Sequence, residues 1–211
     1  MHRIRVVYQA WLACLLCAST LRAAPCRDIA NVDFRNHVIV AARYNGNPFY
    51  GLFNGPGPGG PLRLRAGVFL QWDLTPGEIA KLSAEERDEV MRKPDWKTEI
   101  ERDLLLHPPA GSAGVRVLTL VQEHLTGSGS FTYVVAFDCR SGTLNKVFEA
   151  SGEGVRLERA TASRLELSAG IWGNGDAHAA PSRVERLQYR WSPALKRFVR
   201  EGSNASCPWL P

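Results

Sequence analysis

The chain has 211 residues, of which 45% are hydrophobic and 22% charged, and its formal charge is +5 at neutral pH. Most of that excess comes from Arg3, Arg5 and Arg22, near the start of the chain. Without residues 1–23 the formal charge falls to +2, because no acidic residue leaves with these three arginines. A nearly neutral domain gives little reason to expect a nucleic-acid partner.

Residues 1–23 have the features of an export signal. Two arginines precede the apolar run VVYQAWLACLLCAST, which is shorter than the roughly 20 residues of a membrane span, and a small-residue cleavage site ends at Ala23. We therefore expect one secreted domain over residues 24–211, located in the periplasm or outside the cell, with no transmembrane span after signal removal. A buried N-terminal helix is the alternative, which the basic leader disfavours.

Three cysteines follow the expected cleavage site: Cys26, Cys139 and Cys207. Export implies an oxidising compartment, where an odd count leaves one thiol over. We predict a Cys26–Cys207 disulfide, because both residues lie near the ends of the domain and domain termini are often close together. Cys139 ends an apolar run and is expected to be a small buried hydrophobic residue. No Cys-x-x-Cys motif remains to suggest a zinc site.

Short segments of alternating apolar and polar residues recur along the chain, as in half-buried β-strands. Eight segments have this pattern: residues 37–44, 65–74, 115–124, 131–139, 143–150, 163–170, 185–191 and 196–201. The turns RSG (140–142) and SPAL (192–195) are too short for a crossover helix, so the strands that they join are expected to be antiparallel. We predict a mainly β fold, either an antiparallel β-sandwich or a partial, propeller-like twisted sheet.

One stretch, residues 76–106, is expected to form an inserted helical pair. Ser83 and Glu86 have the spacing of a capping box, which marks a helix N-terminus. Pro94 ends the first piece and Pro108 follows the second, since proline interrupts a helix.

The loop TGSGS (126–130) leads directly into the apolar run FTYVVAF. A phosphate-binding loop needs glycines that enter a helix, whereas β-branched and aromatic residues predict a strand here. The loop is therefore either a plain connector, in which glycines allow the chain to reverse, or a hydroxyl-rich loop presented to a partner. In the second case the candidate partner-binding residues are Ser128, Gly129, Ser130 and Tyr133.

Strand alternation leaves two interpretations of Tyr133. It places Tyr133 on one face with Phe131 and Val135, and Thr132 and Val134 on the other. The Tyr133 hydroxyl is then either packed among its apolar neighbours or presented to a partner.

The Ser-Gly pair followed closely by an aromatic hydroxyl resembles the exposed loop of periplasmic inhibitors of invertebrate-type lysozymes. Members of that family are secreted all-β proteins that plug the active-site groove of the enzyme. Ser128 and Gly129 match the family's Ser-Gly, Phe131 stands where a tyrosine is expected, and Tyr133 follows two residues later. The resemblance implies a secreted glycan hydrolase as partner, and an inhibitor or immunity role.

A second segment, GIWGNGDAHAAPSRVERLQYRW (170–191), is similar to the Asp-x-x-x-x-Pro-Ser then Tyr-x-Trp pattern of exported bacterial β-proteins of unassigned function. The resemblance implies that Asp176 caps an irregular loop. Tyr189 and Trp191 then share one face of a strand, with their polar neighbours on the other. Asp176 and His178 provide too few ligands for a closed metal site.

No recognised catalytic motif accompanies the histidines of the domain. The chain lacks a Gly-x-Ser-x-Gly elbow, a His-Glu-x-x-His motif and a calcium-binding loop. The adjacent Glu123 and His124 point to opposite faces of their expected strand. We therefore expect a non-enzymatic binding protein with no cofactor and no metal. An envelope-associated structural β-domain without a specific ligand is the main alternative, and a hydrolase is the third.

Overall fold

The structure, a computed structural model, describes residues 26–41, 60–74, 76–107, 114–125, 130–171 and 181–202. Strands account for 59% of these residues and helices for 13%, so the prediction of a mainly β, antiparallel fold is confirmed. Among the described residues, no helix has the length and apolar character needed to cross a membrane. The expected export signal, residues 1–23, lies outside them.

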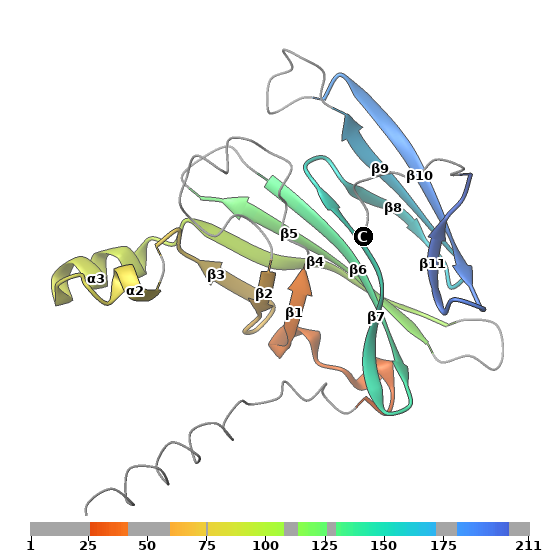
Figure 1. The fold of residues 1–211 in the computed structure, drawn as a ribbon, viewed down its shortest axis with the longest axis horizontal. Helices are drawn as coiled ribbons and strands as arrows, with labels where there is room; N and C mark the ends of the chain where they lie inside the picture. Colours follow the sequence, from red (N-terminus) through yellow and green to blue (C-terminus); the bar gives the residue numbers. More distant parts are fainter. Residues whose placement is uncertain are drawn as a thin grey trace, which may run out of the picture.

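The described residues form three antiparallel sheets (Figure 1). The largest has the order β3 (Val68–Gln71), β4 (Trp96–Leu106), β5 (Val115–His124), β6 (Ser130–Arg140) and β7 (Thr143–Gly152). The second has the order β11 (Arg197–Arg200), β10 (Arg183–Ser192), β9 (Arg164–Ile171) and β8 (Arg156–Ala160). A two-stranded sheet pairs β1 (Val38–Ala41) with β2 (Gly60–Arg63).

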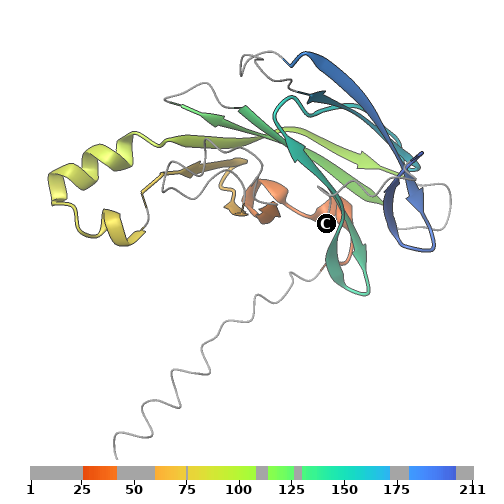
Figure 2. The same ribbon diagram turned by 45° about the horizontal axis from the view of Figure 1, so that its top comes forward.

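The five-stranded sheet is the central layer, and its strands β5 and β6 bury side chains on both faces. On one face, β6 contributes Phe131, Tyr133 and Val135 to a core shared with β1 and β2. On the other face, Val134 and Ala136 pack against the four-stranded sheet. Figure 2 shows the four-stranded sheet (blue) and the β1–β2 sheet (orange) on opposite sides of the central layer. The predicted division of the β6 side chains between two faces is confirmed.

Both predicted hairpin turns are present. Ser141 and Gly142 link β6 to β7 with φ angles of +51° and +77°, the paired positive values that a two-residue hairpin turn requires. In the second hairpin, Ser192 of β10 pairs with Arg197 of β11, and Lys196 takes a φ of +52°. The first hairpin belongs to the five-stranded sheet and the second to the four-stranded sheet.

The helical pair is shorter than predicted. It consists of α2 (Pro76–Ile79) and α3 (Ala84–Arg92), which project from one end of the sheets (Figures 1 and 2). The capping box is confirmed, because the Ser83 amide donates to Glu86 Oε2 at 2.9 Å and the Glu86 amide donates to Ser83 Oγ at 3.3 Å. Trp72 Nε1 donates to the Val90 carbonyl at 2.9 Å and holds α3 against the chain before it.

The predicted second helix is wrong, because residues 96–106 form β4. The stretch TEIERDLLL contains strong helix formers, but β5 beside it is apolar on both faces and its backbone needs a hydrogen-bonded partner. Pairing runs along the whole of β5, from Trp96 opposite His124 to Leu106 opposite Val115. Tertiary pairing has therefore overridden local helix propensity.

An arginine fastens the N-terminal segment to the central sheet. That segment contains two short 3₁₀ helices, η2 (Ile29–Asn31) and η3 (Phe34–Asn36). Arg116 of β5 donates from Nη1 to the carbonyl oxygens of Ile29, Ala30 and Val32 at 3.3, 3.1 and 3.0 Å. Its Nε and Nη2 bind the two oxygens of Asp103, each at 2.6 Å. The side chain thus joins β4, β5 and the N-terminal segment.

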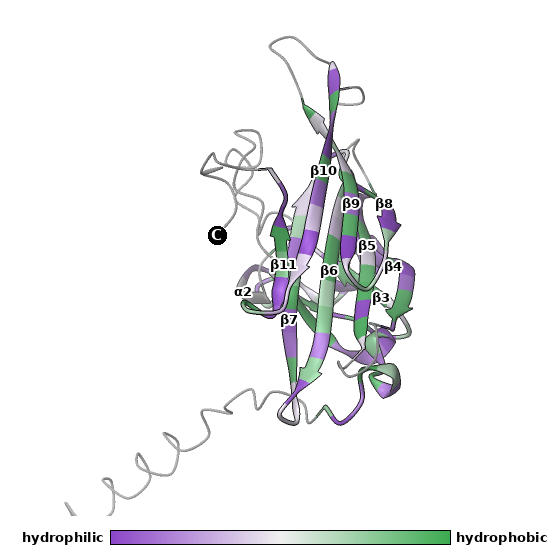
Figure 3. Cartoon of the chain, turned by 90° about the vertical axis from the view of Figure 1, so that its right-hand side faces the viewer, coloured by the Kyte–Doolittle hydropathy of each residue, from purple (hydrophilic) through white to green (hydrophobic). Residues whose placement is uncertain are grey.

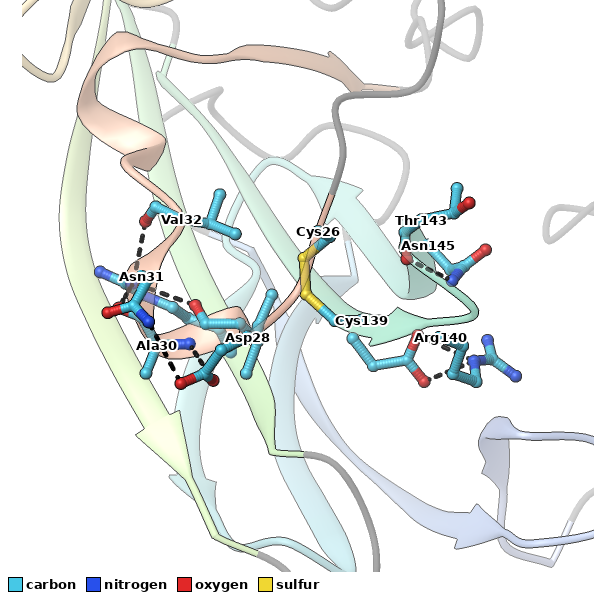
Figure 4. The surroundings of a disulfide bond; sticks show 12 residues. Cys26, Asp28, Ala30, Asn31, Val32, Cys139, Arg140, Thr143 and Asn145 are labelled. Carbon is cyan, nitrogen blue, oxygen red and sulfur yellow. Dashed lines mark hydrogen bonds and ion pairs between the residues drawn. A yellow bond between two sulfur atoms is a disulfide. The ribbon is translucent and has the colours of Figure 1, made fainter.

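A disulfide joins Cys26 to Cys139, so the predicted Cys26–Cys207 pairing is wrong (Figure 4). The two Cα atoms lie 5.4 Å apart, within the usual range for a disulfide. The Cys26 amide also donates to the Gly142 carbonyl at 2.8 Å. The N-terminal segment therefore docks on the β6–β7 hairpin, and closeness of the chain ends does not decide the pairing. Cys207 lies outside the described residues.

His37, between η3 and β1, gives this segment a sensitivity to acid. Its ring packs edge-on against Phe34 with centroids 5.7 Å apart, and burial lowers the pKa of His37 below its usual value of 6.5, although the charge of Asp33 opposes the shift. Below pH 6.5 the unfolded chain takes up the proton more readily than the folded chain. The contribution of neutral His37 to the free energy of unfolding is therefore fully present above pH 6.5. It is lost as the pH falls through the lowered pKa of His37.

We expect the melting temperature to fall between pH 7.5 and pH 5.5, a range above the usual carboxylate pKa values. The substitution His37→Gln should flatten that dependence, whereas His107→Gln, at an exposed position, should leave it unchanged. Thermal melts at both pH values, followed by circular dichroism, test this. A wild-type melting temperature that stays level or rises on acidification would contradict the assignment to His37.

Candidate functional site

An open groove of about 940 Å³ lies where the four-stranded sheet meets the start of β6. The turn between β7 and β8 and the strands β8, β9 and β10 complete its walls. Its lining is mixed: the apolar residues Val155, Leu167, Pro181, Val184 and Leu187 accompany polar and charged residues that include Ser130, Thr132, Arg156, Arg159, Glu166 and Arg186. No aromatic side chain lines it among the described residues.

Strand alternation explains why this surface is polar. Along β9, Leu165 and Leu167 are buried in the core against the central sheet, so Glu166 and Ser168 face the groove. β10 follows the same pattern from Leu187 to Trp191, where Leu187, Tyr189 and Trp191 pack against that core, and Figure 3 colours most of β10 purple or pale. The four-stranded sheet therefore covers one core with its inner face and offers charged side chains on its outer face.

The predicted alternation of Tyr189 and Trp191 with polar neighbours is confirmed. Tyr189 is buried, its ring 4.7 Å from that of Phe148 on β7, and Trp191 packs against the same core. Gln188 and Arg190 are exposed on the opposite face. The proposed loop cap Asp176 lies outside the described residues.

Two rows of side chains cross the sheet in the groove. In the first row, Ser168 of β9 lies between Arg156 of β8 and Arg186 of β10 in the strand register. In the second row, Glu166 lies between Arg159 and Gln188. Directly opposite residues of antiparallel strands point to the same face, so each row forms a continuous polar strip.

A bulge in β8 gives the first row an additional contact. The register shifts between Leu157 and Arg159, which leaves Glu158 as the extra residue. Ser168 is buried and its hydroxyl donates to Glu158 Oε1 at 2.6 Å. A bulge often redirects a side chain in this way, and here it holds one carboxylate of the groove in place.

The arginines of the groove differ from their neighbours on the same sheet. Arg164 and Arg200 pair with Glu201 and Glu185, at 3.1 and 2.6 Å. The groove residues Arg156, Arg159 and Arg186 form no side-chain hydrogen bond and no ion pair with any residue in the described part of the chain. Their guanidinium donors are therefore available to an incoming group.

The structure describes two of the four predicted partner-binding residues, Ser130 and Tyr133, and places them in different environments. Ser130 is exposed at the start of β6 and lines the groove, and Thr132, on the same face of the strand, lines it as well. Ser128 and Gly129 lie outside the described residues. Tyr133 is on the other face of β6 and is fully buried.

The interpretation of Tyr133 as a presented hydroxyl is wrong. Its hydroxyl donates to Gln122 Oε1 of β5 at 2.9 Å, inside the core beneath β1 and β2. Strand alternation carries Tyr133 to the same face as Phe131 and Val135, and that face is covered by the N-terminal segment. Burial of the ring contributes hydrophobic stabilisation, and the hydrogen bond satisfies its polar end.

Removing this hydroxyl tests the structural role. We expect Tyr133→Phe to lower the free energy of unfolding by about 1–2 kcal/mol, because a buried hydrogen bond is lost and the Gln122 oxygen loses this donor. Urea denaturation measures the change. Thr132→Val, a change on the groove face, is the control and should alter stability less. Unchanged stability in Tyr133→Phe would contradict the buried hydrogen bond.

A second polar cluster lies at the end of β5, next to β3 and β4. Trp96 Nε1 donates to Asp73 Oδ1 at 2.9 Å, and the His124 ring packs edge-on against Trp96 with centroids 4.5 Å apart. His124 Nε2 lies 3.8 Å from Asp73 Oδ2, an ion pair when the imidazole is protonated. Across the described residues, no group of three or more His, Cys, Asp and Glu side chains is arranged to hold a metal ion.

Sequence reasoning found only part of the groove. It identified Ser130 and the alternation of the β9 and β10 segments, but β8, with the sequence RLERA, was not predicted as a strand. Arg156 and Arg186 are 30 positions apart in the chain, and only the sheet register brings them into one row.

No family model matches this chain, and neither a curated protein nor a solved structure is detectably similar to it. Its function has to be inferred from the chemistry of the groove.

Proposed function

We propose that this chain is an exported, non-enzymatic β-domain that binds a protein partner in the polar groove. The partner would be a secreted cell-wall hydrolase, which the chain inhibits or against which it gives immunity. The proposal rests on three guanidinium groups that have no partner among the described residues, those of Arg156, Arg159 and Arg186, in an open groove of about 940 Å³ that Ser130 also lines. Such donors bind carboxylates and backbone carbonyls of another chain.

Two further features support this proposal. The buried Cys26–Cys139 disulfide fits an oxidising compartment, as the expected export signal does. The residues that line the groove are mounted on paired strands with a fully packed inner face. Because such a support is already ordered, less conformational entropy is lost when a partner binds. This favours recognition of a partner.

Inhibition assays test the proposal. The purified protein is added to muramidases of several lysozyme types, and the residual activity is measured against inhibitor concentration. We expect inhibition of at least one type, and about tenfold weaker inhibition by the Ser128→Ala/Ser130→Ala double variant, since each lost hydrogen bond is worth about 0.5–1.5 kcal/mol.

The matched control is Ser163→Ala, an exposed hydroxyl before β9 and away from the groove lining, which should inhibit like the wild type. If no muramidase is inhibited, the inhibitor role is wrong. If inhibition persists unchanged in the folded double variant, binding does not use these hydroxyls. An envelope-associated structural domain is the outcome if no partner binds.

A further inference from the structure

The spacing of charges in the groove matches the repeat of an extended polypeptide. Neighbouring strands lie about 4.8 Å apart, so the Cα atoms of Arg156 and Arg186 are about 10 Å apart with Ser168 between them. Glu166 is two residues from Ser168 along β9, which places the two rows about 7 Å apart. Residues i and i+2 of any extended chain have that same separation and point to the same side.

The balance of charge argues against a uniformly anionic ligand. Three arginines of the groove, Arg156, Arg159 and Arg186, are accompanied by three glutamates, Glu153, Glu158 and Glu166. A nucleic acid or another polyanion would meet carboxylates as often as guanidinium groups, and like charges brought together are unfavourable. A segment that carries both signs of charge fits better.

The two rows differ in what they offer to such a segment. The first row offers two guanidinium groups without a partner among the described residues, and a guanidinium group binds a carboxylate through parallel N–H donors. The second row offers Glu166, which forms no hydrogen bond or ion pair with a described residue, whereas Glu158 is already bound by Ser168. The groove therefore has a site for an acidic side chain and, about 7 Å away along β9, a site for a basic one.

We propose that the groove binds an extended segment of the partner in which an acidic and a basic residue stand two positions apart. The acidic side chain binds the guanidinium groups of Arg156 and Arg186, and the basic side chain pairs with Glu166. The identification of the occupant as a polypeptide rests on the proposed function. The absence of aromatic side chains from the described lining leaves a sugar ring without the stacking surface on which such rings pack.

A titration with blocked pentapeptides, followed by amide chemical shifts of the ¹⁵N-labelled protein, tests the proposal. The probe has glutamate at its second position, lysine at its fourth and threonine elsewhere. In the comparison peptide glutamate and lysine are adjacent, so that they point to opposite sides of an extended chain. We expect shifts confined to β8, β9, β10 and the start of β6, and binding of the probe that is about tenfold tighter than that of the comparison peptide.

Variants of the protein make the test specific. Arg156→Glu/Arg186→Glu should weaken binding of the probe by about tenfold or more, whereas Arg63→Glu/Arg65→Glu should leave it within about twofold. The control pair makes the same change of net charge at exposed positions around β2. Arg186→Gln is the second variant if the double reversal perturbs the amide spectrum.

A charge exchange gives an independent readout. Glu166→Lys should lose affinity for the probe and gain affinity for a peptide with glutamate at both positions. Equal binding of probe and comparison peptide, shifts outside the groove, or no binding at all would overturn the proposal. Tighter binding of polygalacturonate or of a single-stranded oligonucleotide would also overturn it, and would identify a polyanion site.

The peptide titration does not depend on a hydrolase. If the peptides bind as expected and no muramidase is inhibited, the hydrolase is the wrong partner and the groove chemistry stands. If a muramidase is inhibited and the peptides show no preference, the recognition pattern is wrong and the proposed function stands.

Discussion

Replacing both Cys26 and Cys139 by alanine is expected to lower the free energy of unfolding by roughly 4–5 kcal/mol. The disulfide closes a loop between residues 113 positions apart, and the loss of chain entropy in the unfolded state grows with loop length to about 4.7 kcal/mol for a 100-residue loop. Because the total stability of a domain is about 5–15 kcal/mol, the variant should be close to unfolding at physiological temperature. Urea denaturation of the oxidised proteins measures the difference.

Two controls separate the disulfide from a general effect of cysteine removal. Cys207→Ala should keep the wild-type midpoint, and reduction of the wild-type protein should reproduce the loss seen in the double variant. A large loss of stability in Cys207→Ala would contradict the Cys26–Cys139 assignment. A reduced wild-type protein as stable as the oxidised one would contradict it as well.

The substitution Arg116→Lys is expected to destabilise the protein by about 2–3 kcal/mol. Lysine keeps the charge but cannot bind both oxygens of Asp103 and the three carbonyls of the N-terminal segment at the same time. The Arg116 and Asp103 side chains are 19% and 26% exposed, so solvent screens the pair only in part and the expected loss exceeds that of a surface pair. The Arg116 guanidinium also lies 5.3 Å from the centre of the Phe34 ring, a contact that lysine would weaken.

The comparison pair is Lys93 and Glu89, whose side chains are 72% and 63% exposed. Lys93→Ala should change stability by no more than about 0.5 kcal/mol. Urea denaturation gives the total change. Hydrogen exchange should show faster exchange in residues 29–37 of Arg116→Lys before the sheets open. Stability within about 0.5 kcal/mol of the wild type would show that Arg116 does not fasten the segment.

The Cys26–Cys139 disulfide and Arg116 both attach the N-terminal segment to the central sheet. The central sheet has a second apolar face, and a short N-terminal segment covers part of it with Ile29 and Phe34. The disulfide at Cys26 and the contacts of Arg116 join this segment to β4, β5 and β6. Loss of either attachment weakens the cover that Ile29 and Phe34 give to the apolar face.

The sequence predicted those features whose causes are local. Alternating side chains located β5, β6 and β7 within one or two residues, because burial of a sheet face imposes a period of two. The turn at Gly142 followed from its freedom to adopt a positive φ, and the start of α3 followed from the spacing of Ser83 and Glu86.

Predictions that depended on a distant neighbour failed. Residues 96–106 have helical propensity and form a strand because β5 lies beside them. The short strands β2 and β8 lack a clear pattern of their own and exist through their pairing with β1 and β9. Propensity amounts to a few tenths of a kcal/mol per residue, less than the stabilisation from a paired and buried strand.

By itself, then, the sequence determined the antiparallel β class, the two hairpins and the division of β6 into two apolar faces, since each depends on residues within about ten positions of one another. Only the tertiary structure decided which cysteine joins Cys26, that Tyr133 is buried, and that Arg156, Ser168 and Arg186 form one row. These are contacts between strands far apart in the chain. Register and packing fix such contacts, and no local pattern of residues encodes them.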